Sequence, residues 1–333
     1  MDMRRYTLGI VTLLTIISFC LVGCPRKGAS NQQHDEDNIS LFRLEKLIFD
    51  TPAEQLQQVL QQHYSDYACQ LLNVNPGDAQ LMSQMVGFAQ DESVREIYDS
   101  VQARFANLYW LEAELTEAMK RAEKAGIELD YQRYITFVSA MFDYDFRVAA
   151  DGSTLLIAID QYVLPCFEKY GYIGTPMYIV RLCDSAYLAT DCMAAVGRNL
   201  AAFPEKEPTM LDYMIAEGKT LYFLDQVMPR KADSLKIRYT IEQMEWMKEN
   251  EANVWAYFVQ NKMLFDKDLN HFNNFIDEAP KTNAFRNSAP RTAQYIGWQI
   301  VRQYMQKSKV SLAELMEESN SQKILDASGY HPK

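Results

Sequence analysis

Hydrophobic positions recur with a helical period over much of the N-terminal part of the chain. The segment TPAEQLQQVLQQHYSDY begins with Thr51, a favourable N-cap residue, followed by proline at the first helical position. A longer amphipathic segment, DESVREIYDSVQARFANLYWLEAELTEAMKRAEKAG, is expected to break near Asn107 and to end at Gly126, a residue suited to a C-cap. The pattern therefore predicts a helical part covering residues 41–130.

The pattern changes near Tyr131, where β-branched and aromatic residues replace the helical period. RYITFVSAMF is rich in both kinds of residue, YDFRVAA alternates, and STLLIAID is an apolar segment. The dipeptide Asp151–Gly152 separates the last two segments and is typical of a hairpin turn. We predict a small antiparallel sheet around residues 134–160.

Helical periodicity returns after the predicted sheet and continues to the end of the chain. One helix is expected over residues 178–202 and another between Pro208 and Pro229. Further helices are expected in SLKIRYTIEQMEWMKENEANVWAYFVQNKMLF (two helices), RTAQYIGWQIVRQYMQKS and SLAELMEESNSQKILDASGY. This order predicts an α+β, mostly α-helical fold in which the small sheet packs against helices.

We interpret residues 41–333 as a single domain, because no internal repeat or second linker interrupts them. Its helical part is expected at residues 41–130, and its sheet plus helical part at residues 131–333. Residues 24–40 are polar and lack apolar periodicity, so they are predicted to form a flexible tether in front of the domain.

The first 23 residues have the features of a bacterial lipoprotein signal peptide. Arg4 and Arg5 form a basic start, LGIVTLLTIISF is a short apolar core, and LVGC resembles a lipobox. We expect Cys24 to be acylated and to become the mature N-terminus. The alternatives are an ordinary signal peptide and a signal anchor.

Acidic residues outnumber basic residues in this chain, by 44 to 33, which gives a formal net charge of -11. This excess argues against nucleic acid as a partner and against electrostatic attachment to anionic lipid. Membrane association is therefore expected to come from the lipid on Cys24. The remaining cysteines apart from Cys20 are expected to be free and mostly buried thiols: Cys69, Cys166, Cys183 and Cys192.

The sequence lacks the common motifs of catalysis. It has four histidines, and none is followed by another four residues later, so the zinc-binding motif HExxH is absent. It also lacks the nucleophile motif GxSxG and the phosphate-binding motifs GxGxxG and GxxxxGK[ST]. We therefore expect no metal, no cofactor and no enzymatic activity.

One carboxylate lies in an apolar helical stripe. Glu217 shares its face of the predicted helix with Met210, Met214, Leu221 and Leu224. Burying a carboxylate without a partner costs several kcal/mol, so a cation is expected beside it.

Arg302 is the first candidate for this cation, because the helix that carries it is apolar on most sides and should be buried. Arg198 and Arg181 follow as candidates. A ligand-binding role for Glu217 and simple exposure to solvent remain as alternatives.

Four segments, EGKTLYFLDQVMP, NEANVWAYF, PRTAQYIGWQIVRQYM and ILDASGY, resemble the gliding-motility-associated lipoprotein GldB family of Bacteroidota, in that order. FVSAMFDYDFRVAADGSTLLIAIDQYV resembles the sheet region of that family. The resemblance covers most of residues 131–330 and is weak before them. It agrees with the lipobox.

That family resembles gluzincin-type zinc peptidases, in which a Glu in a helix like EGKTLYF is a metal ligand. In an active peptidase HExxH would lie some twenty residues before this Glu, and here the corresponding stretch is DCMAAVGRNL. The resemblance therefore implies a peptidase-like fold without its metal. It places Glu217 and Arg302 in the former active-site region, with Trp298, Tyr222 and Arg198 as further candidate groove residues.

The resemblance implies a lipid-anchored, non-enzymatic protein of the gliding or secretion machinery that acts through protein–protein interaction. No acidic run follows Cys24, which favours an outer-membrane position facing the periplasm. The alternatives are a hydrolase with a rebuilt site and a lipoprotein that binds peptide or glycan. Metal analysis of the mature domain would distinguish the hydrolase.

The lipid anchor can be tested by changing Cys24→Ser. The variant should receive no lipid and should leave the membrane fraction, because the acylated cysteine is the expected attachment point. Incorporation of labelled fatty acid and cell fractionation measure both effects. Equal labelling of the Ser variant would contradict the prediction.

Overall fold

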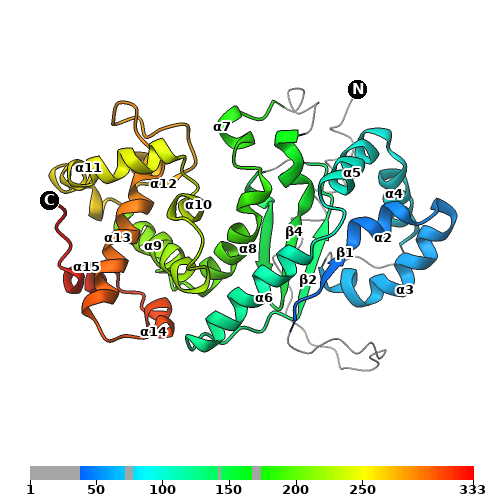
Figure 1. The fold of residues 1–333 in the computed structure, drawn as a ribbon, viewed down its shortest axis with the longest axis horizontal. Coiled ribbons are helices and arrows are strands. Elements are labelled where there is room, and N and C mark those ends of the chain that lie inside the picture. The colour runs from blue at the N-terminus through cyan, green and yellow to red at the C-terminus, as the bar shows by residue number, and fades with distance from the viewer. Residues whose placement is uncertain (1–37, 72–77, 142–143, 167–173) are drawn as a thin grey trace.

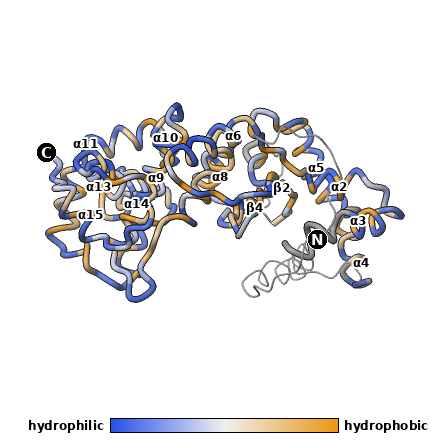
Figure 2. Tube along the Cα trace, turned by 90° about the horizontal axis from the view of Figure 1, so that it is seen from below, coloured by the Kyte–Doolittle hydropathy of each residue, from blue (hydrophilic) through white to orange (hydrophobic). Residues whose placement is uncertain are grey.

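The computed structural model describes residues 38–71, 78–141, 144–166 and 174–333. Three parts follow one another along the long axis of the molecule (Figure 1): the N-terminal helices, the sheet, and the C-terminal helices. Figure 2 shows the same order from below, with hydrophobic and hydrophilic stretches alternating along most helices. This alternation is the pattern expected of helices that bury one face.

The N-terminal part is helical, as predicted, except that Leu41–Arg43 forms a strand. It contains α2 (Leu44–Asp50), α3 (Ala53–Leu71), α4 (Ala79–Gln90), α5 (Glu92–Arg104) and α6 (Tyr109–Lys124). Asp91 caps α5 by accepting hydrogen bonds from the backbone N–H groups of Ser93 and Val94. The break expected near Asn107 separates α5 from α6, and Gly126 takes the left-handed conformation (φ +83°) just after α6.

The sheet has four strands and is mixed. The strands β1 (Leu41–Arg43), β2 (Arg133–Phe137), β3 (Val148–Asp151) and β4 (Thr154–Ala158) lie in the order β1-β2-β4-β3. β1 and β4 are both parallel to β2, and only β3 is antiparallel to its neighbour β4. The predicted hairpin is confirmed, because Asp151 pairs with Thr154 across the turn at Gly152.

The prediction of a purely antiparallel sheet was therefore wrong. Parallel neighbours need a long connection, and here helices α2 to α6 provide the one between β1 and β2. β1 has only three residues and lies some ninety residues before its partner, so no local pattern could indicate the pairing.

In the described residues after the sheet, the regular elements are helices and short 3-10 turns. The helices are α7 (Met177–Val180), α8 (Ser185–Leu200), α9 (Met210–Val227), α10 (Asp233–Ile237), α11 (Ile241–Gln260), α12 (Leu269–Ile276), α13 (Thr292–Lys307), α14 (Leu312–Glu317) and α15 (Ser321–Ser328). The single helix predicted over residues 178–202 is divided, because Asp184 caps the start of α8 by accepting from the N–H of Ala186. In Figure 1, α6 crosses in front of the sheet and α8 lies beside it.

The helices α9 and α13 approach so closely that their backbones touch. A Cβ atom added at Gly218 would lie 2.4 Å from the carbonyl oxygen of Gly297, and one added at Gly297 would lie 1.8 Å from that of Met214. No side chain can occupy either position without separating the helices. Trp298, next to this crossing, is completely buried.

Gly297→Ala should therefore destabilise the fold strongly, by at least about 3 kcal/mol, because the new methyl group meets backbone atoms that cannot move aside. Gly87→Ala in α4 is the matched control. No atom lies within 4 Å of its added Cβ, so the change should stabilise the helix by about 0.5–1 kcal/mol. Urea unfolding of the mature protein measures both, and a neutral Gly297→Ala would contradict the close packing.

Candidate functional site

Glu217 pairs with Arg198 and not with Arg302. Its carboxylate accepts hydrogen bonds from Arg198 Nε at 3.1 Å and from Nη2 at 3.3 Å. The pair joins α9 to α8 and is partly open to water, with 21% of the Glu217 side chain and 46% of the Arg198 side chain exposed. The predicted Glu217–Arg302 pair was therefore wrong, whereas Arg198 was among the cations expected behind Arg302.

Arg302 binds a different carboxylate, that of Asp225 on α9. Its Nε and Nη2 donate to the two Asp225 oxygens at 2.7 and 2.9 Å. Lys236 Nζ and Trp298 Nε1 donate to the same carboxylate at 2.7 and 2.9 Å. Asp225, two turns after Glu217, thus forms ion pairs with Lys236 of α10 and Arg302 of α13.

The other two groove candidates differ in exposure. Trp298 is fully buried and lies 3.7 Å from the Arg302 guanidinium, ring centroid to carbon, so it cannot line an open groove. Tyr222 is half-buried, and burial raises the pKa of its hydroxyl. Trp298 is a core residue that positions the Arg302–Asp225 pair.

Helix α8 contributes Asp191 to a buried ion cluster. Asp191 Oδ2 accepts from Arg147 Nε at 3.0 Å and from the Tyr162 hydroxyl at 2.8 Å, and Oδ1 accepts from Arg238 Nη1 at 2.5 Å. Burial raises the pKa of the Asp191 carboxyl, but the two guanidinium groups outweigh it, so the pKa lies below its usual value. Asp191 is therefore ionised and neutralised from two sides.

Cys183 and Cys192, near this cluster, are free and buried. Burial raises the pKa of the Cys183 thiol to about 12 and that of Cys192 well above its usual value, so neither is a ready nucleophile. The side chains of Cys69 and Cys166 lie outside the described residues. Within the described part of the chain, no group of three or more His, Cys, Asp or Glu side chains is placed to hold a metal ion.

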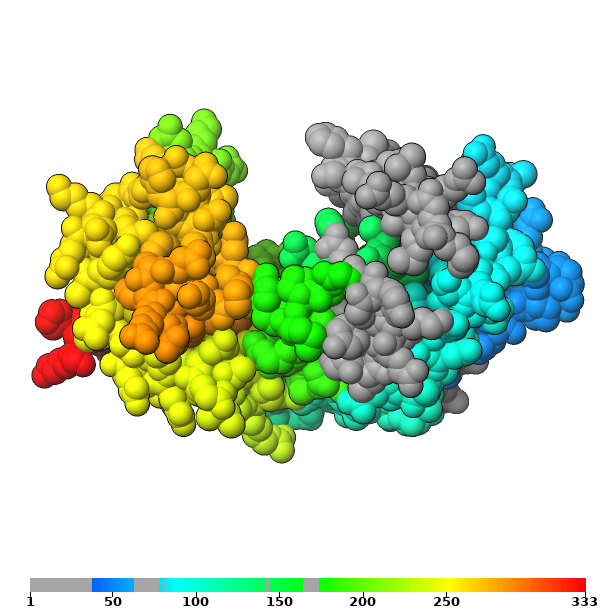
Figure 3. All heavy atoms as spheres, turned by 90° about the horizontal axis from the view of Figure 1, so that it is seen from above, coloured from blue at the N-terminus to red at the C-terminus, as the bar shows by residue number. Residues whose placement is uncertain are grey.

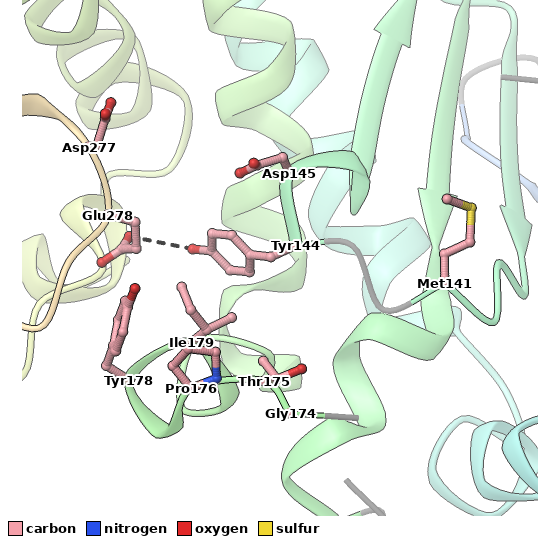
Figure 4. A pocket seen from close by; sticks show the side chains of 10 residues that line it. All are labelled: Met141, Tyr144, Asp145, Gly174, Thr175, Pro176, Tyr178, Ile179, Asp277 and Glu278. Atoms are coloured by element: carbon pink, nitrogen blue, oxygen red, sulfur yellow. Dashed lines mark hydrogen bonds between the residues drawn. The ribbon is translucent and has the colours of Figure 1, made fainter. Parts of the chain in front are cut away.

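A pocket of about 770 Å³ lies where three segments meet near the sheet. The segments are the 3-10 turn η2 (Tyr144–Phe146), the start of α7 and the residues that follow α12. Figure 3 shows this face, where the bright-green segment that contains α7 lies at the centre, directly beside the orange segment. Figure 4 shows the lining side chains: Met141, Tyr144, Asp145, Gly174, Thr175, Pro176, Tyr178, Ile179, Asp277 and Glu278.

Tyr144 is held in the pocket wall by the buried ion cluster. The guanidinium carbons of Arg147 and Arg238 lie 4.2 and 5.0 Å from its ring centroid, and Arg147 Nη1 donates to the Tyr144 carbonyl oxygen at 2.8 Å. The Tyr144 hydroxyl donates to Glu278 Oε2 at 3.5 Å (Figure 4). Glu278 also lies 3.3 Å from Arg291 Nε. One wall of the pocket is thus fixed by charges behind it.

Two apolar residues next in sequence to lining residues are largely exposed. Phe146 is 61% and Met177 is 64% exposed, and each neighbours a lining residue in sequence. Burial, and then the nearby Asp145 carboxylate, raise the pKa of Asp277. The sequence analysis missed this pocket, because its residues come from three separate segments, the first and last of which lie about 130 residues apart, and form no motif.

These features define the protein as a mostly helical α+β protein with a small mixed sheet and an acidic, aromatic pocket beside it. The chain belongs to the gliding motility protein GldB family, whose model matches residues 27–332. No curated protein and no solved structure matches the chain. The sequence-based assignment to this family of gliding-motility-associated lipoproteins is therefore confirmed.

The family is associated with the cell envelope. In the described residues, no helix is both long enough and apolar enough to cross a membrane. Cys24, the predicted site of lipidation, lies outside the described residues and outside the matched range. Its acylation stays a prediction.

The two ion pairs of α9 should differ in their contribution to stability. Asp225→Asn removes the less exposed of the two carboxylates that pair with Lys236, whose side chain is 4% exposed, and with Arg302, leaving only Asp233 beside them, and should destabilise by about 3 kcal/mol. Glu217→Gln is the matched change at a water-exposed pair and should cost less than about 1 kcal/mol. Urea unfolding measures both, and a larger loss for Glu217→Gln would reverse the ranking.

Proposed function

We propose that this protein is anchored by lipid to the outer membrane, faces the periplasm, and binds another envelope protein without catalysing a reaction. The family match and the LVGC lipobox support the location. Phe146 and Met177, two exposed apolar residues next in sequence to pocket-lining residues and here called the apolar rim, are the observation that carries protein binding, because exposed apolar groups near a depression are typical of interaction sites.

The fold is proposed to be that of a gluzincin-type peptidase that has lost its metal. In this proposal α8 and α9 correspond to the two metal-binding helices. This proposal is supported by α8, which carries packing residues where an active peptidase would carry metal ligands. Met193 is fully buried, and a Cβ atom added at Gly197 would lie 2.9 Å from the Phe223 ring. Glu217 of α9 corresponds in this proposal to a metal-ligand position, and it pairs with Arg198 of α8.

The interaction can be tested by cross-linking the intact, tagged lipoprotein in cells and identifying its partners. The double variant Phe146→Ser and Met177→Ser should lose a partner that the wild-type protein retains, because the apolar rim is removed. Phe265→Ser is the control, since Phe265 is equally exposed (63%) and does not line the pocket.

Both serine variants should reach the envelope and unfold at the wild-type temperature, since exposed side chains contribute little to stability. Retention of every partner by the rim variant would contradict the proposal. Loss of the same partner in Phe265→Ser would contradict the location of the site.

A further inference from the structure

We propose that the start of α6, where Tyr109 and Trp110 are exposed, lies against the lipid bilayer that carries the anchor, with both aromatic rings in the interfacial layer of the lipids. This inference rests on the lipid anchor of the proposed function and adds the face of the domain that meets the membrane. Three features support it: the exposure of the two rings, the point at which the chain enters the fold, and the charges along α6.

The two aromatic rings lie outside the packing of their helix. Leu111 and Leu115 of α6 are completely buried, whereas Tyr109 is 73% and Trp110 is 41% exposed. Tyr109 is the most exposed large hydrophobic residue of the described chain. The side chains of Tyr and Trp join an apolar ring to a polar hydroxyl or N–H group, and such side chains are enriched at the boundary between lipid headgroups and acyl chains.

The chain enters the fold along the same helix. The backbone N–H of Ile39 donates to the Thr116 hydroxyl oxygen at 3.0 Å, and that of Leu41 donates to the Glu112 carboxylate at 2.8 Å. The strand β1 therefore runs beside α6 (Figure 1). Thr116 follows Tyr109 by two helical turns, so the entry point of the chain and the exposed rings are about 10 Å apart along the helix axis.

A lipid at Cys24 brings the bilayer within reach of these rings. Thirteen residues lie between Cys24 and Asn38, and a fully extended chain covers this stretch in at most about 50 Å. Because the rings lie close to the entry point, the bilayer can contact Tyr109 and Trp110 while the chain from Cys24 is well short of full extension. The anchor also keeps the bilayer at a high local concentration, so the insertion of two rings needs little affinity of its own.

The charges along the first part of α6 do not oppose this contact. Each of its three carboxylates already has a partner: Glu112 (the N–H of Leu41), Glu114 (Lys231, 2.8 Å) and Glu117 (Arg121, 2.9 Å). Before the helix, Lys46 Nζ donates to the carbonyl oxygen of Ala106 at 3.2 Å, so a cation lies at the end of α6 that carries the rings. A lysine beside interfacial aromatic residues suits the phosphates of lipid headgroups.

The test uses protein produced from the full chain, extracted with detergent and reconstituted into vesicles of phosphatidylethanolamine and phosphatidylcholine with plain or brominated acyl chains. Bromine quenches tryptophan fluorescence only at short range, so brominated chains should remove the share of the emission that comes from Trp110, one of four tryptophans. Trp110→Phe should abolish this loss. Trp255→Phe is the matched control, because Trp255 packs on Tyr330 and belongs to α11 at the far end of the molecule (Figure 1), and it should leave the quenching in place.

Tyr109→Ser retains every tryptophan and should at least about halve the quenching, because one of the two inserted rings is lost. Circular dichroism of the three variants should match that of the wild-type protein, since the exposed rings contribute little to stability and Trp255→Phe is conservative. Equal emission in plain and brominated vesicles, or quenching that is unchanged in Trp110→Phe, would overturn the inference.

Flotation of the same vesicles distinguishes this inference from the proposed function. If the protein does not float with the vesicles, the anchor fails and the membrane-facing side of α6 fails with it. If the protein floats and Trp110 is not quenched, the anchor stands and this inference alone is wrong. If Trp110 is quenched but the rim variant retains every envelope partner, the membrane contact stands and the proposed protein binding fails.

A protein partner is the other possible occupant of this face. Loss of an envelope partner in Tyr109→Ser, without quenching of Trp110 in the wild-type protein, would assign the face to that partner and overturn the inference.

Discussion

The contact between Gly218 of α9 and Gly297 of α13 is the constraint on which the C-terminal half of the molecule depends. Where two backbones touch, no side chain of either helix can enter between them. Glu217, next to Gly218, turns away from this contact and meets Arg198 of α8. Beyond the crossing the helices leave room for long side chains, and there Asp225 meets Arg302 and Trp298. One close contact thus decides which charges pair.

The elements that the sequence predicted well are those encoded by neighbouring residues. The helices of residues 41–130, the break near Asn107 and the turn at Gly152 all follow from caps, periodicity and turn chemistry. The parallel pairing of β1 and the partner of Arg302 depend on residues far away in the sequence. A stripe of apolar residues shows that Arg302 is near the core, but it does not show which turn of α9 it meets.

The ion cluster around Asp191 illustrates a second limit of sequence analysis. The stretch DCMAAVGRNL was informative only through the zinc ligands that it lacks. In the structure its aspartate joins Arg147, which precedes β3, to Arg238, which follows α10. Such a buried cluster is a poor source of stability, because desolvation offsets much of the attraction. Its consequence here is positional, since both arginines hold the ring of Tyr144 at the pocket.

The pocket and the predicted anchor together limit where a partner can lie. Thirteen residues lie between Cys24 and Asn38, the first residue that the structure describes, and a fully extended chain covers this stretch in at most about 50 Å. If Cys24 carries lipid, the folded domain stays within that distance of the membrane surface, whatever conformation those residues take. The protein and a partner at the same membrane then meet within a thin layer. Their local concentration in this layer is high, so a low binding affinity is sufficient.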